Sequence, residues 1–126
     1  MLPETELRQL LIDSCHSVPM AESRILAELG SVDFIAQLVF IAIDVLDYQG
    51  DAPMQAAYFL SITNPSLVIP HEAALLSLLE TADGYSGSIA VALGRMRSTL
   101  AKSLIEKRDR EGWGPQYHEA LALYQN

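Results

Sequence analysis

The chain has 126 residues, half of them apolar, and its 16 acidic and 8 basic side chains give a net charge of −8. A chain of this length and composition is expected to form one folded domain, residues 1–126, and not a disordered segment. The N-terminus lacks the apolar segment of a signal peptide, and the most apolar stretch, residues 34–43, is too short to span a bilayer. The single cysteine, Cys15, excludes an internal disulfide, so we expect a cytoplasmic protein with no membrane partner.

Helical periodicity runs through the first half of the chain. Apolar residues at helical spacing predict one helix after Pro3 and a second after Pro19, which ends at Gly30. Ser31 is placed to cap a third helix, about residues 32–48. This third helix is apolar on nearly every side and is therefore expected in the centre of the fold.

The second half of the chain is helical as well. Asp51 is expected to cap a helix that ends before residue 64, and NPSLVIP, residues 64–70, is the one stretch that could be extended. Pro70 opens the next helix, and Ser88 is expected to cap a long helix that reaches about residue 110. A glycine-rich break precedes a short final helix. The sequence therefore predicts an all-α fold of about seven helices.

A weak internal repeat has a period of 33 residues, which is typical of stacked helical hairpins. Residues 74–96, ALLSLLETADGYSGSIAVALGRM, resemble a HEAT repeat of the short, phycobilin-lyase type, and residues 41–62 are similar at fewer positions. The matching residues are Leu78, Leu79, Asp83, Ala90, Ala92, Leu93, Gly94 and Arg95 in the first copy, and Leu46, Asp51, Ala57 and Leu60 in the second.

The resemblance covers roughly residues 41–96. It implies antiparallel α-hairpins stacked as an α-α superhelix and a habit of binding, and it implies no reaction. The family usually has an arginine early in the second helix of each repeat, whereas Gln55 and Ser88 stand near that place here. Gly94 costs about 1 kcal/mol relative to alanine inside a helix, so its presence indicates close packing.

Two His-Glu pairs, at His71 and His118, resemble the start of a zinc-protease motif. Such a motif needs a second histidine four residues on, and Leu75 and Ala122 occupy those positions. The pairs are better explained as helix starts, where a carboxylate favours the positive end of the helix. Cys15 and the histidines lack metal-ligand spacing, so we expect no metal, no cofactor and no catalytic set.

Several residues are candidates for binding a partner. Asp44, Asp47 and Asp51 recur at helical spacing, and they are typical of a solvated face with a cap, of a Mg²⁺ site or of an acidic docking strip. The second-helix face offers a further group, formed by Gln55, Tyr58, Ser88 and Arg95. Trp113 is either a lid on the core or an interface anchor, and the basic residues of the long helix form a solvated face or contact an acidic surface.

The charge is unevenly distributed, and this bears on function. Residues 1–94 hold twelve acidic and two basic side chains, whereas residues 95–126 hold six basic and four acidic ones. An acidic body repels nucleic acid and attracts a basic protein. The leading hypothesis is therefore a non-enzymatic inhibitor of the bacterial immunity or antitoxin type, which neutralises a basic partner such as a nuclease toxin. The alternatives are an α-hairpin adaptor that binds a peptide or protein through its concave face, and a metal-dependent enzyme.

Overall fold

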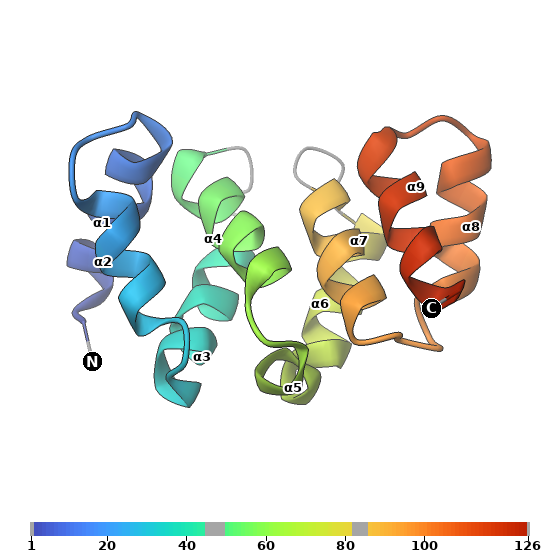
Figure 1. Ribbon diagram of the computed structural model, residues 1–126, viewed down its shortest axis with the longest axis horizontal. Coiled ribbons are helices and arrows are strands. Elements are labelled where there is room, and N and C mark those ends of the chain that lie inside the picture. The colour runs from blue at the N-terminus through green and yellow to red at the C-terminus, as the bar shows by residue number, and fades with distance from the viewer. Residues whose placement is uncertain (1, 45–49, 82–85, 126) are drawn as a thin grey trace.

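The computed structural model describes residues 2–44, 50–81 and 86–125, and every regular element in these residues is helical (Figure 1). The elements are α1 (Glu4–Cys15), α2 (Ala21–Glu28), α3 (Val32–Ala42), α4 (Asp51–Ile62), α5 (Pro65–Val68), the 3-10 helix η1 (Ile69–His71), α6 (Glu72–Thr81), α7 (Ser86–Arg95), α8 (Lys102–Arg110), α9 (Pro115–Ala122) and the 3-10 helix η2 (Leu123–Gln125). The all-α prediction is confirmed.

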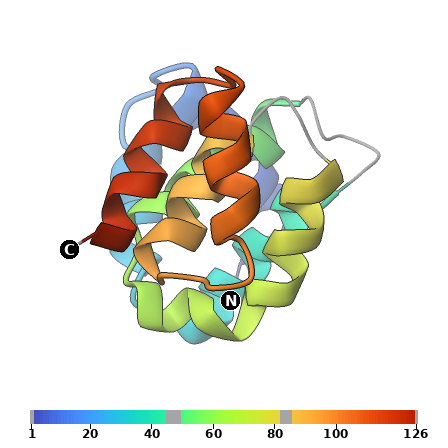
Figure 2. The same ribbon diagram turned by 90° about the vertical axis from the view of Figure 1, so that its right-hand side faces the viewer.

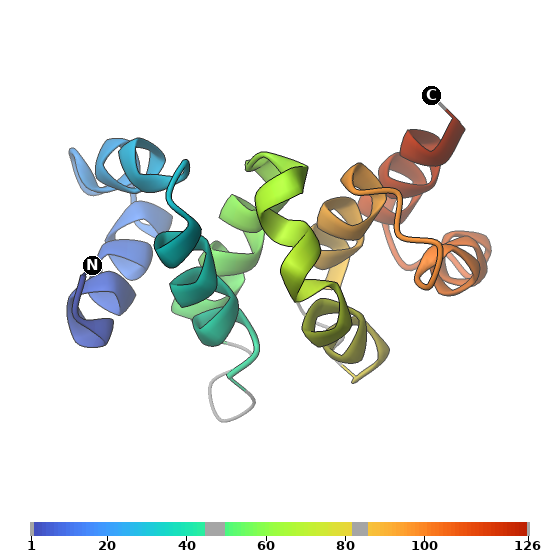
Figure 3. The ribbon, with the colours of Figure 1, turned by 90° about the horizontal axis from the view of Figure 1, so that it is seen from below.

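The helices stack as hairpins. α3 packs on α4, α6 on α7, and α8 on α9, while α4, α7 and α9 contact one another in that order and α1 continues their row beyond α4. The second helices therefore form one layer and the first helices α3, α6 and α8 form the other (Figure 3). α4 and α7 end at Ile62 and Arg95, 33 residues apart, which matches the period in the sequence.

α4 and α7 each pack against helices on three sides, so the prediction that the helix at 32–48 lies in the centre is wrong for its described residues. α7 is buried continuously from Ser88 to Gly94. α3 ends at Ala42, and residues 45–49 lie outside the described residues. α3 belongs to the layer of first helices and packs one face on α4, so Phe40 on its other side remains 60% exposed.

The helix starts are only partly as predicted. Ser31 caps α3 as expected, since its Oγ accepts a hydrogen bond from Phe34 N at 3.2 Å. Asp51 does not cap α4, because Gly50 occupies the cap position and the Asp51 side chain bonds to His16 instead. Ser88 is the third residue of α7 and is buried, so it does not cap that helix either.

Residues 64–70 are helical where the sequence suggested an extended segment. The Asn64 side chain accepts a hydrogen bond from Ser66 N at 3.0 Å, and Pro65 occupies the first helical position of α5. An Asn-Pro pair thus starts a helix here, because proline is well tolerated in a first turn. η1 follows directly, and α6 begins at Glu72, so the pair at His71 does mark a helix start.

The predicted long helix from 88 to 110 is broken into α7 and α8. Arg97 adopts a left-handed φ of 53°, and Ser98 N donates to Leu93 O at 3.0 Å, which closes the end of α7. The turn sends α8 back to pair with α9 (Figure 2). The close packing predicted at Gly94 is confirmed, since a Cβ there would lie 2.7 Å from Ala120 O on α9.

Candidate functional site

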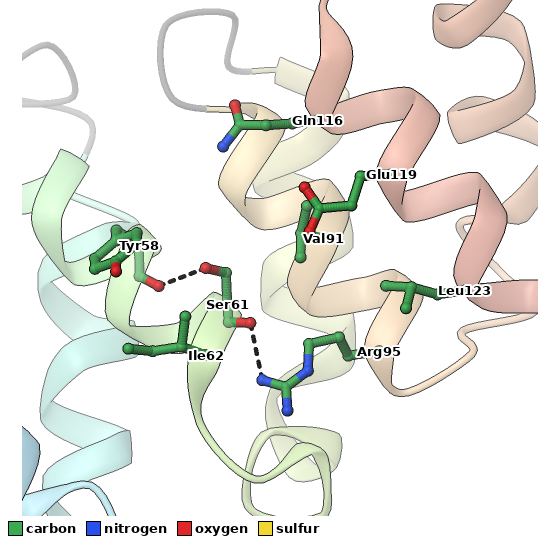
Figure 4. A pocket seen from close by; sticks show the side chains of 8 residues that line it. All are labelled: Tyr58, Ser61, Ile62, Val91, Arg95, Gln116, Glu119 and Leu123. Carbon is green, nitrogen blue, oxygen red and sulfur yellow. Dashed lines mark hydrogen bonds between the residues drawn. The ribbon is translucent and has the colours of Figure 1, made fainter.

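A groove with a volume of about 440 Å³ crosses the layer of second helices, and we call it the α4/α7/α9 groove (Figure 4). It lies where α4, α7 and α9 stand side by side. Its lining residues are Tyr58, Ser61 and Ile62 from α4, Val91 and Arg95 from α7, Gln116 and Glu119 from α9, and Leu123 from η2.

The apolar part of the groove lies mainly on α4. Tyr58 and Ile62 are four residues apart, so they share one face of the helix, and each is 40% exposed. The Tyr58 ring packs edge-on against Phe59, with centroids 5.2 Å apart. Val91 of α7 and Leu123 of η2 line the groove from the opposite side (Figure 4). A ligand side chain between these walls would bury apolar surface that now faces water.

Two charged groups line the same groove. Arg95 donates from Nη1 to Ser61 O at 2.9 Å and to Thr63 O at 2.7 Å, which ties α7 to the end of α4. Its Nε and Nη2 donate to no described residue, and no described carboxylate pairs with it. Glu119, on α9, forms no ion pair with another described residue either. The groove therefore offers one free set of donors and one free carboxylate.

Ser88 and Gln55 lie on the expected helices but do not line the groove. Ser88 is only 9% exposed, and its Oγ accepts a hydrogen bond from Gln116 Nε2 at 3.3 Å. The Gln116 side chain lies so close to Gly87 that a Cβ there would overlap Gln116 Oε1. The Ser88 hydroxyl thus holds the Gln116 side chain in position. Gln55 donates to Ser14 Oγ at 3.1 Å and joins α4 to α1.

The predicted acidic strip is occupied by contacts within the chain. Asp44 Oδ2 lies 2.8 Å from Arg8 Nη2, and Asp51 Oδ2 lies 2.8 Å from His16 Nε2. Asp47 lies outside the described residues. Two of the three carboxylates therefore already have a basic partner, which lowers their value for attracting a basic protein.

Trp113 covers part of the core and keeps one side open to solvent. Its ring lies over Arg108, with Cζ 4.1 Å from the ring centroid, and packs edge-on against Tyr117. Arg108 is only 6% exposed and donates from Nη1 to Leu79 O and to Tyr117 Oη. Trp113 itself is 43% exposed. Of the two predictions for the basic residues of the long helix, a solvated face and a contact with an acidic surface, neither describes Arg108, because α8 turns it towards α6 and α9.

The side chains that could do chemistry are dispersed. No three His, Cys, Asp or Glu side chains gather into a metal-binding group within residues 2–44, 50–81 and 86–125. Burial, and secondarily the charge of Asp51, raise the pKa of the Cys15 thiol. Burial, and secondarily Glu72, raise the pKa of Tyr124 to about 12. Both groups are therefore protonated at neutral pH.

The sequence predicts only part of the groove. Tyr58 and Arg95 were expected on one face and do meet there, whereas Ile62, Val91, Gln116, Glu119 and Leu123 were not identified. The contribution of α9 was missed because the α8/α9 hairpin carries no visible repeat. An apolar residue one turn after Tyr58 is the sequence signal that could have indicated Ile62.

No family model matches this chain, and comparisons with curated proteins and with solved structures gave no match. None of the helices among the described residues has the length and apolarity needed to cross a membrane.

Proposed function

We propose that this domain is a non-enzymatic adaptor that binds a peptide segment of a partner protein in the α4/α7/α9 groove. The observation that carries the proposal is the meeting of half-exposed Tyr58 and Ile62 with free charged groups of Arg95 and Glu119 in one hollow. A mostly apolar hollow with a few convergent polar groups is the usual form of a binding site. Apolar contact supplies affinity there, and the two charges fix orientation.

The chemistry of the groove describes the peptide that it fits. An aliphatic or aromatic side chain would pack between Tyr58 and Ile62. A lysine or arginine of the peptide would pair with Glu119, and a peptide carbonyl or carboxylate would accept from the free nitrogens of Arg95. The peptide thus needs an apolar anchor and a basic residue at a fixed distance from it.

Selection of random short peptides displayed on phage, with the intact protein as bait, tests this function. We expect the selected peptides to share an apolar residue and a basic residue at constant spacing. Their affinity should fall at least about tenfold, near 1.4 kcal/mol, when Tyr58 and Ile62 are both changed to Ser.

The matched control is Ile69→Ser, because Ile69 is 52% exposed and lies outside the groove. This variant should bind the selected peptides as tightly as the parent. Peptides without a shared pattern, or equal affinity for the Tyr58/Ile62 variant and the parent, would remove the groove from consideration.

A second candidate is the inhibitor of a basic partner such as a nuclease toxin. The observation that favours it is the surplus of ten acidic over basic side chains in residues 1–94. Such a surplus accelerates association with a basic protein in a salt-dependent way. A partner that binds the Tyr58/Ile62 variant normally, and whose association slows as salt rises, would favour this candidate over the adaptor.

A further inference from the structure

A second hollow, separate from the groove above, lies between α1 and α3 and has a volume of about 290 Å³. We call it the α1/α3 hollow. Its floor includes Leu7 and Ile41, which are at most 1% exposed, and its rim carries Phe40, which is 60% exposed. Glu4, Asp33 and Gln37 supply its polar side chains.

The side-chain oxygen atoms of Asp33 and Gln37 in this hollow have no described hydrogen-bond partner, and they can only accept hydrogen bonds. Gln37 uses its amide nitrogen to donate to Leu2 O, and its Oε1 is buried without a donor among the described residues. The Asp33 carboxylate forms neither an ion pair nor a hydrogen bond with another described side chain. The Glu4 carboxylate, in contrast, already has a partner, because it forms an ion pair with Arg8 at 3.1 Å. A ligand must therefore bring donors, and a positive charge would match Asp33.

The surroundings of Asp33 are also acidic. An adjoining hollow of about 170 Å³ shares Asp33 and Gln37 with the first and adds Glu28 to its lining. The linings that include Asp33 thus also include the carboxylates of Glu4 and Glu28. Arg8, the basic side chain at Glu4, is already held by Glu4 and Asp44.

The apolar and acidic features together specify the ligand. A lysine or arginine side chain has an apolar stem and a cationic head that only donates hydrogen bonds. The stem would pack against Phe40, and the head would pair with Asp33 beside Gln37. An arginine would gain additional attraction from the face of the Phe40 ring.

We propose that the α1/α3 hollow binds a lysine- or arginine-bearing segment of a basic protein partner. The charge complementarity is local, at Asp33 and Gln37, and it is reinforced by the acidic surplus of residues 1–94. This site does not depend on the α4/α7/α9 groove, since the two hollows share no lining residue.

The test uses a synthetic amphipathic peptide of lysine and leucine, and the same peptide with every lysine acetylated. Binding to the intact protein is measured by calorimetry at fixed ionic strength. We expect the lysine peptide to bind and the acetylated peptide to bind at least about tenfold more weakly. In NMR spectra of the protein, the lysine peptide should shift the amide signals of residues 33–41 most strongly. The change of Asp33 to Asn together with Phe40 to Ala should weaken the lysine peptide at least about tenfold.

Two controls separate a site from a diffuse acidic field. Glu22→Gln removes one exposed negative charge on α2, away from the hollow, and Leu100→Ala trims an apolar side chain that is 64% exposed. Neither should alter binding by more than about twofold, whereas equal losses in the controls and in the site variant would overturn the proposal. Thermal melts confirm that each variant is folded. Because the lysine peptide also carries the apolar and basic residues that the groove would bind, the measurements are repeated in the Tyr58/Ile62 variant. The change at Asp33 and Phe40 should still weaken binding at least about tenfold there, so failure of the groove and failure of this hollow give different results.

Discussion

Arginine side chains join successive parts of this molecule. Arg8 links α1 to Asp44 just beyond α3, Arg95 links α7 to the end of α4, and Arg108 links α8 to Leu79 near the end of α6. The last carbonyls of a helix have no partner within the helix and carry partial negative charge. The guanidinium groups of Arg95 and Arg108 supply such carbonyls with hydrogen-bond donors and a positive charge. The sequence predicts Arg95 as a binding residue and places Arg108 among basic residues that form a solvated face or contact an acidic surface, because a long side chain gives no sign of which carbonyl it will reach.

At Gly94 the structure predicts a loss of stability on Gly94→Ala. The added Cβ would lie 2.7 Å from Ala120 O, and backbone on α9 cannot move aside as a side chain could. Overpacking of this kind costs about 1–3 kcal/mol, while the better helix propensity of alanine returns at most about 1 kcal/mol. Urea unfolding should therefore give a lower free energy of unfolding for this variant.

The matched control is Gly30→Ala, because a Cβ at Gly30 meets nothing within 4 Å. This control should be neutral or slightly stabilising, since alanine restricts the unfolded chain. A Gly94→Ala variant as stable as Gly30→Ala would mean that α7 and α9 lie further apart than the structure places them.

Helix boundaries differ in how far local sequence determines them. The start of α3 could be predicted because Ser31 is a local cap, and its bond to Phe34 N is made as expected. The break between α7 and α8 could not, because RMRSTLAK contains neither glycine nor proline and continues the apolar stripe. Packing of α9 on both α7 and α8 requires the turn there, and this tertiary demand overrides local preference.

The same break makes Arg97→Gly a stabilising substitution. Arg97 has a φ of 53°, a conformation that costs a residue with a side chain about 1–2 kcal/mol and glycine very little. After the larger backbone entropy of glycine in the unfolded chain is subtracted, we expect a gain of about 0.5–1 kcal/mol in the free energy of unfolding. Urea unfolding measures it.

Arg97→Ala serves as the control, because it removes the same charge and keeps the Cβ. It should show no gain. Equal gains in the two variants would assign the effect to charge and not to backbone conformation.

Across the whole molecule, the sequence could predict the fold class and the charge, but it could not predict which surfaces remain exposed to solvent. The all-α fold followed from periodicity, and the acidic body followed from composition. Both hollows depend on how the hairpins stack. Phe40 seemed a core residue because α3 is apolar on nearly all sides, and only the position of α3 in its layer decides which side faces water. Glu119 joined the groove through a third hairpin that has no repeat signal in the sequence.

The uneven charge also predicts how salt acts on stability. With a net charge of −8 and most acids in residues 1–94, repulsion within the folded body exceeds the attraction from its few ion pairs. Raising ionic strength from about 0.01 M to about 0.15 M shortens the screening length from about 30 Å to about 8 Å, so repulsion between dispersed carboxylates weakens. The partly buried Arg8–Asp44 pair is screened much less. The free energy of unfolding in urea, which is uncharged, should therefore rise with added sodium chloride.

Glu22→Lys changes the net charge from −8 to −6 at an exposed site, and the rise should be smaller in that variant. A fall in stability with salt would mean that the ion pairs made by Arg8 and Arg24 outweigh the repulsion among the acids.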